Sequence, residues 1–184
     1  MKKSTIAVLV ILAVLLVGIV TTYNSVMSSK IAIDAQRGQI ENQIQRRADL
    51  IPNLISTVKG YMQHEEKVLN EVTEARTRVT KAGSTEDLAA ANGQLSAALG
   101  RLIAVSENYP TLKADAHFTE LMREISGSEN RIAVARRDYN EAVRKYNTVI
   151  ATFPGNLISG IMGCQSVAQF TAEESAHEVP KVSF

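Results

Sequence analysis

Phe118–Val149 reads FTELMREISGSENRIAVARRDYNEAVRKYNTV, and its apolar and small residues recur at alternating steps of three and four. We call such a row of positions a seam; this one consists of Phe118, Leu121, Ile125, Ser128, Ile132, Ala135, Tyr139, Ala142, Tyr146 and Val149. A strand would alternate every second residue, so the spacing is typical of a helix packed along one face. The sequence therefore predicts a helix of about 50 Å, which Phe153-Pro154-Gly155 ends.

An earlier stretch carries the same spacing. Its seam consists of Ile40, Ile44, Arg47, Ile51, Leu54, Val58, Tyr61, Glu65, Val68, Val72, Ala75 and Val79. Pro52 lacks a backbone donor and crowds the preceding turn, so we expect a kink or a short break near Asp49–Asn53. Val26 and Ile33 fall on the same seam when it is extended backwards, which predicts a helix that begins before it.

Ala82-Gly83-Ser84-Thr85 separates this stretch from a third one. Gly83 suits a left-handed residue after a helix end, and Ser84 with Asp87 resembles a capping box. The third seam, which Pro110 closes, consists of Leu88, Ala91, Leu95, Ala98, Leu102, Val105 and Tyr109. Three long amphipathic segments, one of them kinked, predict an all-α fold: an antiparallel bundle of long helices that resembles a four-helix bundle.

The chain begins with a different kind of segment. Ile6–Val20 reads IAVLVILAVLLVGIV without a polar residue, and with its flanks it reaches the roughly 20 residues that span a bilayer. A cleaved signal peptide is the competing interpretation, but no A-x-A site follows. We predict a retained transmembrane helix, and the positive-inside rule applied to Lys2 and Lys3 places the N-terminus in the cytoplasm.

The predicted organisation has three parts. Residues 1–23 form the transmembrane anchor, residues 24–163 the helical bundle and residues 164–184 a polar C-terminal tail. Leu157, Ile158, Ile161 and Met162 are spaced as in a short amphipathic turn after the last long helix. No linker rich in Ser and Gly separates anchor from bundle, which predicts a stiff junction.

The composition excludes some partners and sites. Twenty Lys and Arg against nineteen Asp and Glu give a net charge of +1, so we expect no nucleic-acid partner. A single Cys excludes an internal disulfide. The basic residues of the last long helix alternate with acidic ones, which favours a solvated face over one that binds lipid headgroups.

No catalytic or metal-binding constellation is complete. Glu174 and His177 form the one Glu-x-x-His, in the tail, so a di-iron bundle site lacks its ligands. His64-Glu65 is followed by Val68 where a zinc protease needs His. Cys164 is interpreted as an incidental thiol. We therefore predict no catalytic residue, cofactor-binding residue or metal ligand.

Two charged residues fall on a seam. Arg47 and Glu65 occupy positions that face the core, where an unpaired charge lowers the stability of the fold by roughly several kcal/mol. We expect opposite charges or carbonyl groups of a neighbouring helix beside them. They are candidate buried polar residues that fix helix register; the alternative is a polar patch that binds a partner.

Several segments at fixed spacing resemble the LemA family of bacterial membrane proteins. They are RRADLIPNL (46–54), VKGY (58–61), His64-Glu65, ENYP (107–110), LKA (112–114), Phe118, Leu121, ENRIA (129–133), Ala135-Arg136, Tyr139-Asn140, Val143, Tyr146-Asn147 and PKVSF (180–184). The resemblance implies a single-pass membrane protein with a long-helix bundle and no established catalytic activity. The region around Cys164 departs from the family pattern, so no role is carried over to that residue.

The resemblance also directs the functional hypothesis. Arg46, Asp49 and Asn53 lie in the main motif but off the seam, which makes them candidates for contact with a partner. We expect an interaction or scaffold protein of the bacterial inner membrane, with its bundle outside the cytoplasm and protein partners of unknown identity, a second copy of the chain being one candidate. The alternatives are a lipid- or curvature-binding bundle, or a metal-dependent sensor or enzyme that uses His64 and His117.

Overall fold

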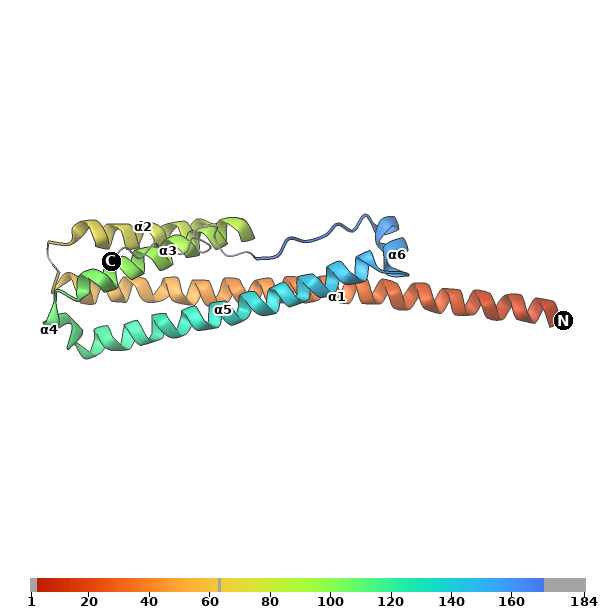
Figure 1. Cartoon of the computed structure of the whole chain (residues 1–184), viewed down its shortest axis with the longest axis horizontal. Coiled ribbons are helices and arrows are strands. Elements are labelled where there is room, and N and C mark those ends of the chain that lie inside the picture. Colours follow the sequence, from red (N-terminus) through yellow and green to blue (C-terminus); the bar gives the residue numbers. More distant parts are fainter. Residues whose placement is uncertain (1–2, 63, 171–184) are drawn as a thin grey trace, which may run out of the picture. The chain divides into compact units, whose positions relative to one another are not determined.

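The computed structural model describes residues 3–62 and 64–170 (Figure 1). These residues form six helices and no strand: α1 Lys3–Lys59, α2 Glu66–Lys81, α3 Thr85–Ser106, α4 Pro110–Lys113, α5 Ala116–Ala151 and α6 Gly155–Met162. The all-α prediction, with a long apolar N-terminal helix followed by helices that pack together, is confirmed.

The chain divides into two compact units. One falls within Met1–Gln36 and Asp138–Gln169, and the other within Arg37–Arg137 and Phe170–Phe184. Both long helices, α1 and α5, contribute residues to each unit.

The second unit is an antiparallel bundle of four helical segments: residues 37–59 of α1, α2, α3 and residues 116–137 of α5. Contacts between α2 and α3 join Arg78 to Gln94 and Glu71 to Arg101. Arg47 of α1 pairs with Glu129 of α5, and Tyr61, just after α1, contacts Asp115, just before α5. In both cases residue numbers rise on one side as they fall on the other, so each pair runs antiparallel.

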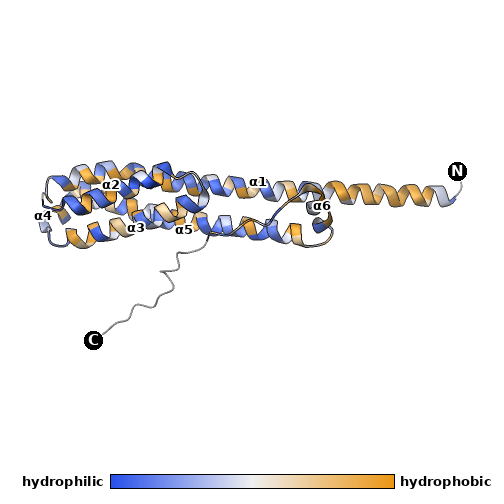
Figure 2. Ribbon diagram, turned by 90° about the horizontal axis from the view of Figure 1, so that it is seen from above, coloured by the Kyte–Doolittle hydropathy of each residue, from blue (hydrophilic) through white to orange (hydrophobic). Residues whose placement is uncertain are grey.

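Seam residues make up most of the core of this unit, which also contains Met62, Leu99 and Leu112 from outside the predicted seams. Its largest fully buried side chains are Ile40, Ile44, Ile51, Leu54, Val58, Met62, Leu95, Leu99, Leu102, Leu112 and Ile132. Figure 2 shows the corresponding alternation of apolar and polar residues along α2, α3 and α5.

Pro52 does not interrupt α1, so the predicted short break near Asp49–Asn53 is wrong. Proline lacks the N–H that would bond the carbonyl oxygen four residues earlier, which is that of Ala48. Arg76 of α2 supplies the missing donor: its Nε lies 3.0 Å from the Ala48 carbonyl oxygen. Since Ala48 is fully buried, the guanidinium replaces a hydrogen bond that water could not provide.

The first stretch is instead divided at Gly60–Glu65. The helix ends at Lys59, and Tyr61 and Met62 both donate their N–H groups to the carbonyl of Val58. Glu65 therefore lies outside a helix, at the N-cap of α2. Extending the seam from Val58 through Glu65 was wrong because the backbone turns there.

The other helix ends also differ in detail. Ser84 caps α3, since its Oγ accepts the N–H of Asp87 at 3.0 Å, as predicted. The prediction that Gly83 adopts the left-handed conformation is wrong. The helix α2 ends in extended backbone at Ala82, with φ −60° and ψ 125°. Tyr109 lies beyond the last residue of α3, Ser106, and is the N-cap of α4.

The first unit contains residues 3–36 of α1, the end of α5, α6 and the segment that follows it. Residues 3–21 are exposed, including the whole apolar run, which Figure 2 shows as an unbroken apolar stretch. Within the part of the chain that the structure describes, two helices, α1 and α3, are long and apolar enough to cross a membrane. In α3 one face is buried in the bundle, whereas the apolar window of α1 is 0% buried.

Burial on α1 begins after the apolar run. Val26, Ser29 and Ile33 are buried at steps of three and four, and Tyr139, Val143 and Tyr146 are buried on α5. The long helix of the predicted last seam ends at Ala151, just before Phe153-Pro154-Gly155, as expected. Of the predicted tail, residues 171–184 lie outside the described residues.

Candidate functional site

A buried polar cluster lies in the core of the second unit. Its members, which we call the Arg47 cluster, are Arg47, Asn92, Ser96 and Glu129. The Nη1 of Arg47 forms an ion pair with Glu129 Oε2, donates to Ser96 Oγ at 2.8 Å and lies 3.4 Å from Asn92 Oδ1. The Ser96 hydroxyl lies 3.3 Å from Glu129 Oε2. One guanidinium group thus connects α1, α3 and α5.

The two charges of this cluster differ in exposure. The Arg47 side chain is 5% exposed, whereas that of Glu129 is 43% exposed. Burial lowers the pKa of Arg47 and nearby Arg136 lowers it further, while the Glu129 carboxylate opposes both effects. The Nη1 of Arg47 is paired, whereas its buried Nε has no hydrogen-bond partner among the described residues. A buried ion pair that holds three helices suits a structural role; that Arg47 fixes helix register stays a prediction.

The three predicted contact residues lie on the outside of α1. Arg46, Asp49 and Asn53 are all exposed, and their spacing of three and four places them on one face of the helix. The carboxylate of Asp49 accepts a hydrogen bond from Gln45 Nε2 at 2.7 Å. They form a polar surface on the side of α1 that does not carry Ile44 and Ile51; its contact role stays a prediction.

Two tyrosine–carboxylate pairs join the loops at one end of the bundle. Tyr109 donates its hydroxyl to Glu65 at 3.2 Å, and Tyr61 donates to Asp115 at 3.1 Å. The hydrogen bond to Asp115 and the charge of that carboxylate raise the pKa of Tyr61. The pKa of Tyr109 is raised first by burial and then by the hydrogen bond to Glu65 and the charge of Glu65. Glu65 is half-buried rather than in the core, and its register role stays a prediction.

Asp115 also caps α5. Its Oδ1 accepts the N–H of Phe118 at 2.9 Å, and this bond is the main cause that lowers the pKa of the carboxyl group. The sequence reasoning missed this residue. An Asp three positions before Phe118, the first residue of a long seam, is the signal that would have identified it.

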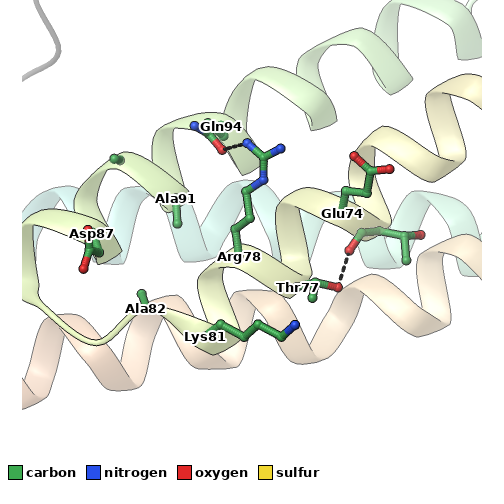
Figure 3. Close-up of a pocket in the computed structure, with 10 residues that line it drawn as sticks. Glu74, Thr77, Arg78, Lys81, Ala82, Asp87, Ala91 and Gln94 are labelled. Carbon is green, nitrogen blue, oxygen red and sulfur yellow. Dashed lines mark hydrogen bonds between the residues drawn. The ribbon is translucent and has the colours of Figure 1, made fainter.

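A shallow pocket of 620 Å³ lies on the surface between α2 and α3 (Figure 3). Its charged lining residues are Glu74, Arg78, Lys81 and Asp87, two of each sign, and Arg78 is held by the Oε1 of Gln94 at 2.7 Å. Two charges of each sign favour neither an anionic nor a cationic small-molecule ligand, so we assign none to this pocket. No motif had pointed to this pocket.

The residues considered for metal or nucleophilic chemistry are not brought together. His64 and His117 are both exposed, and among residues 3–62 and 64–170 no three His, Cys, Asp or Glu side chains are placed to share a metal ion. Cys164 is half-buried beside Tyr146, whose pKa is raised by burial and by a hydrogen bond with that thiol. Glu174 and His177 lie outside the described residues.

Comparisons with known proteins point to one family. The profile of the LemA family matches residues 36–184. Magnetosome protein MamQ 2 of Paramagnetospirillum magneticum is 28% identical over 100% of this chain and 75% of its own length. Magnetosome protein MamQ of Magnetospirillum gryphiswaldense is 25% identical over 100% and 78%. Protein LemA of Metamycoplasma hominis is 27% identical over 82% of this chain and 69% of its own length.

Proposed function

The chain belongs to the LemA family, and from this premise we propose that it is a membrane-anchored interaction or scaffold protein of the bacterial envelope. In this account the anchor holds the bundle at the inner membrane, and the bundle binds other proteins or a second copy of itself. It performs no catalytic step. The names of the MamQ relatives assign those proteins to magnetosomes, and we carry over no partner from them.

One observation carries the proposal: the apolar run lies exposed on α1, and none of the residues in 3–62 and 64–170 covers it. The exposed fraction of its large side chains ranges from 49% at Ile6, through 56% at Leu12, to 66% at Val14. A soluble protein rarely exposes so large a contiguous apolar surface. A helix of this length and composition reaches across the hydrocarbon core of a bilayer, so residues 1–23 act as the anchor.

The orientation follows from charge. Lys2 and Lys3 precede the apolar run, and Lys30 and Arg37 follow it at a greater distance. Positively charged residues next to a membrane helix stay on the cytoplasmic side. The N-terminus is therefore cytoplasmic and residues 24–163 lie outside the cytoplasm.

Arg46, Asp49 and Asn53 form the proposed contact surface. All three are exposed on a helix whose opposite face is buried, and none of them takes part in the Arg47 cluster. Mixed positive, negative and amide groups suit the polar rim of a protein interface better than a lipid headgroup.

Site-specific photo-crosslinking in intact membranes tests this surface. A photoreactive amino acid replaces Asn53 in one variant, and Asn70 of α2 or Asn130 of α5, both exposed, in matched controls. We expect discrete protein adducts from position 53 that the controls do not give; an adduct of twice the chain's mass identifies a second copy. Lipid adducts alone, or the same proteins from all three positions, would contradict the proposal.

A further inference from the structure

Three large apolar side chains project from the turn before α6 and from α6 itself. Phe153 is 79% exposed, Leu157 58% and Ile161 85%, and we call them the α6 patch. Exposed apolar side chains in the second unit are scattered and less exposed, at 40% for Tyr61, 42% for Ile103 and 48% for Val134 among the residues described there. Leu157 and Ile161 are one turn apart, so they point from the same face of α6.

The other face of α6 is docked on the end of α5. Gly155 and Ser159 are buried, and the hydroxyl of Ser159 donates to the carbonyl oxygen of Ile150 at 3.0 Å. The contact at Gly155 is so close that an added Cβ would collide with the carbonyl oxygen of Val149. Small residues thus face α5, and the large apolar residues are left outside.

The segment after α6 holds it in this position. Gly163 adopts the left-handed conformation, with φ 64°, and Cys164 donates its N–H to the carbonyl oxygen of Ser159 at 2.9 Å. This is the hydrogen bond of a Schellman helix end. Farther on, the side-chain amide of Asn147 both donates to and accepts from the backbone of Val167, at 2.9 and 3.0 Å. These hydrogen bonds set the position of α6 and so leave the side chains of the α6 patch exposed.

The α6 patch lies in the same compact unit as the apolar run of α1. Figures 1 and 2 both show α6 beside the part of α1 where the apolar stretch ends. The run ends at Val20 and the first buried residue of α1 is Val26, about 9 Å farther along a helix. The headgroup layer of a bilayer is of similar thickness, about 7 Å on each side.

Charge distinguishes this region from the rest of the chain. No charged residue occurs between Lys3 and Lys30, or between Lys145 and Glu173. The two uncharged segments are the ones that this unit brings together, so neither would have to desolvate a charge at a bilayer surface. Arg144, Lys145 and Lys30 border them, and basic side chains at this depth suit lipid phosphates.

We propose that α6 is a second membrane contact. Phe153, Leu157 and Ile161 enter the interface of the leaflet from which α1 emerges, and α6 lies along the bilayer surface. The ligand is a phospholipid surface rather than a single bound lipid, because all three side chains of the α6 patch are more than half exposed. This inference rests on the proposed anchoring by α1.

The chain contains no Trp, so a single introduced Trp reports on its own position. The full chain is reconstituted in phosphatidylcholine–phosphatidylglycerol vesicles with Ile161→Trp, Leu157→Trp or the conservative Phe153→Trp. The control is Ile103→Trp, an exposed isoleucine of the second unit, and Leu12→Trp reports on the anchor. Emission is then measured with lipids brominated near the headgroup or deep in the chains.

We expect about a twofold loss of emission from each of the three α6 variants with shallow bromines, as for an interfacial helix, and almost none from Ile103→Trp. Leu12→Trp should respond most to deep bromines.

If Leu12→Trp is quenched but the α6 variants match the Ile103→Trp control, the second contact is wrong and the anchor stands. If Leu12→Trp is not quenched, the anchoring itself fails. A blue shift of the α6 variants without lipid quenching means that a protein covers the α6 patch, which also overturns the proposal. Circular dichroism confirms that each variant keeps its helices.

Discussion

At the scale of single residues, the Arg47 cluster is the most distinctive feature of the bundle. A guanidinium group that is 5% exposed depends on its partners, whereas the partner carboxylate of Glu129 still reaches water. Replacing only one member of a buried ion pair leaves the other uncompensated, which is more costly than replacing both by apolar groups.

Glu129→Ala should therefore lower the free energy of unfolding. We expect a loss of about 1–2 kcal/mol, less than for a fully buried pair because water can approach Arg47 from the exposed side of the carboxylate. Urea unfolding of the full chain in detergent, followed by circular dichroism, measures this loss. The double variant Arg47→Met, Glu129→Leu should recover most of this lost stability.

The control is Glu120→Ala, which removes the carboxylate of a surface pair with Arg123 on the same helix. It should change stability by less than about 0.5 kcal/mol. Equal effects at 120 and 129 would contradict the structural role.

Asp115 predicts a dependence of stability on pH. Its pKa lies below the ordinary value of 3.8 in the folded chain, first because its carboxylate accepts the N–H of Phe118. A group whose pKa is lowered by folding stabilises the fold above its ordinary pKa, and this contribution is lost as the pH falls through the folded pKa. An Asn at this position still caps the helix but does not titrate.

The stability difference between the native chain and Asp115→Asn should thus decrease when the pH is lowered from 6 to below 3.8. Urea unfolding at a series of pH values gives this difference. Asp87→Asn, in the first turn of α3, serves as a comparison because Asp87 contributes its N–H, not its carboxylate, to the Ser84 cap. A constant difference for Asp115→Asn across the series would show that its carboxylate is not used in capping.

The position of Arg47 could be predicted, but its partner could not. Ile44, Arg47 and Ile51 follow the helical spacing, which places Arg47 in the core from local sequence alone. Glu129 lies 82 positions away, and which acidic residue reaches Arg47 depends on the register of α5 against α1. That register is set by the packing of all four segments, so no local pattern contains it.

At the scale of elements, Pro52 shows how one helix supports another. The sequence predicts the defect correctly, because a proline always leaves the carbonyl four residues earlier without its usual donor. It does not predict the outcome, because the replacement donor, Arg76, belongs to a different helix. An orphaned carbonyl favours a break only where no side chain or water can reach it.

Arg76→Met should therefore destabilise the native chain by about 1–2 kcal/mol, the cost of leaving a buried carbonyl oxygen without a donor. In a Pro52→Ala background the N–H of residue 52 can bond Ala48, so the same substitution should cost less than about 0.5 kcal/mol. Urea unfolding of the four chains of this cycle gives the coupling directly. Arg78→Met, which removes an exposed arginine of α2 bonded to Gln94, should be nearly neutral in both backgrounds. Identical costs of Arg76→Met with and without Pro52 would refute the compensation.

The ends of helices were harder to predict than their existence. Gly60 follows α1 directly, yet the apolar spacing continues from Val58 to Val68 and conceals the turn. In the turn itself, Met62 is fully buried, whereas the seam residue beside it, Tyr61, is 40% exposed. Spacing along the sequence thus identifies residues that face the core within a helix, and it stops doing so where the helix ends.

At the scale of the whole chain, average composition conceals two populations of residues. A mean hydropathy of −0.03 and a net charge of +1 are ordinary for a soluble protein. They combine an exposed apolar run in α1 with amphipathic segments whose apolar residues are buried. Fold class and antiparallel pairing could be predicted from periodicity; the docking of α6 could not, because it depends on the close approach of Gly155 to α5.

The central claim is that α1 anchors the bundle in a membrane and that the bundle lies outside the cytoplasm. The most direct measurement fuses a reporter to the C-terminus of the full chain: alkaline phosphatase, which is active outside the cytoplasm, or green fluorescent protein, which in this export route fluoresces only inside it. We expect phosphatase activity without fluorescence, in a membrane fraction from which alkaline carbonate does not extract the protein. Cytoplasmic fluorescence would contradict the orientation, and release of the protein by carbonate would contradict the anchor.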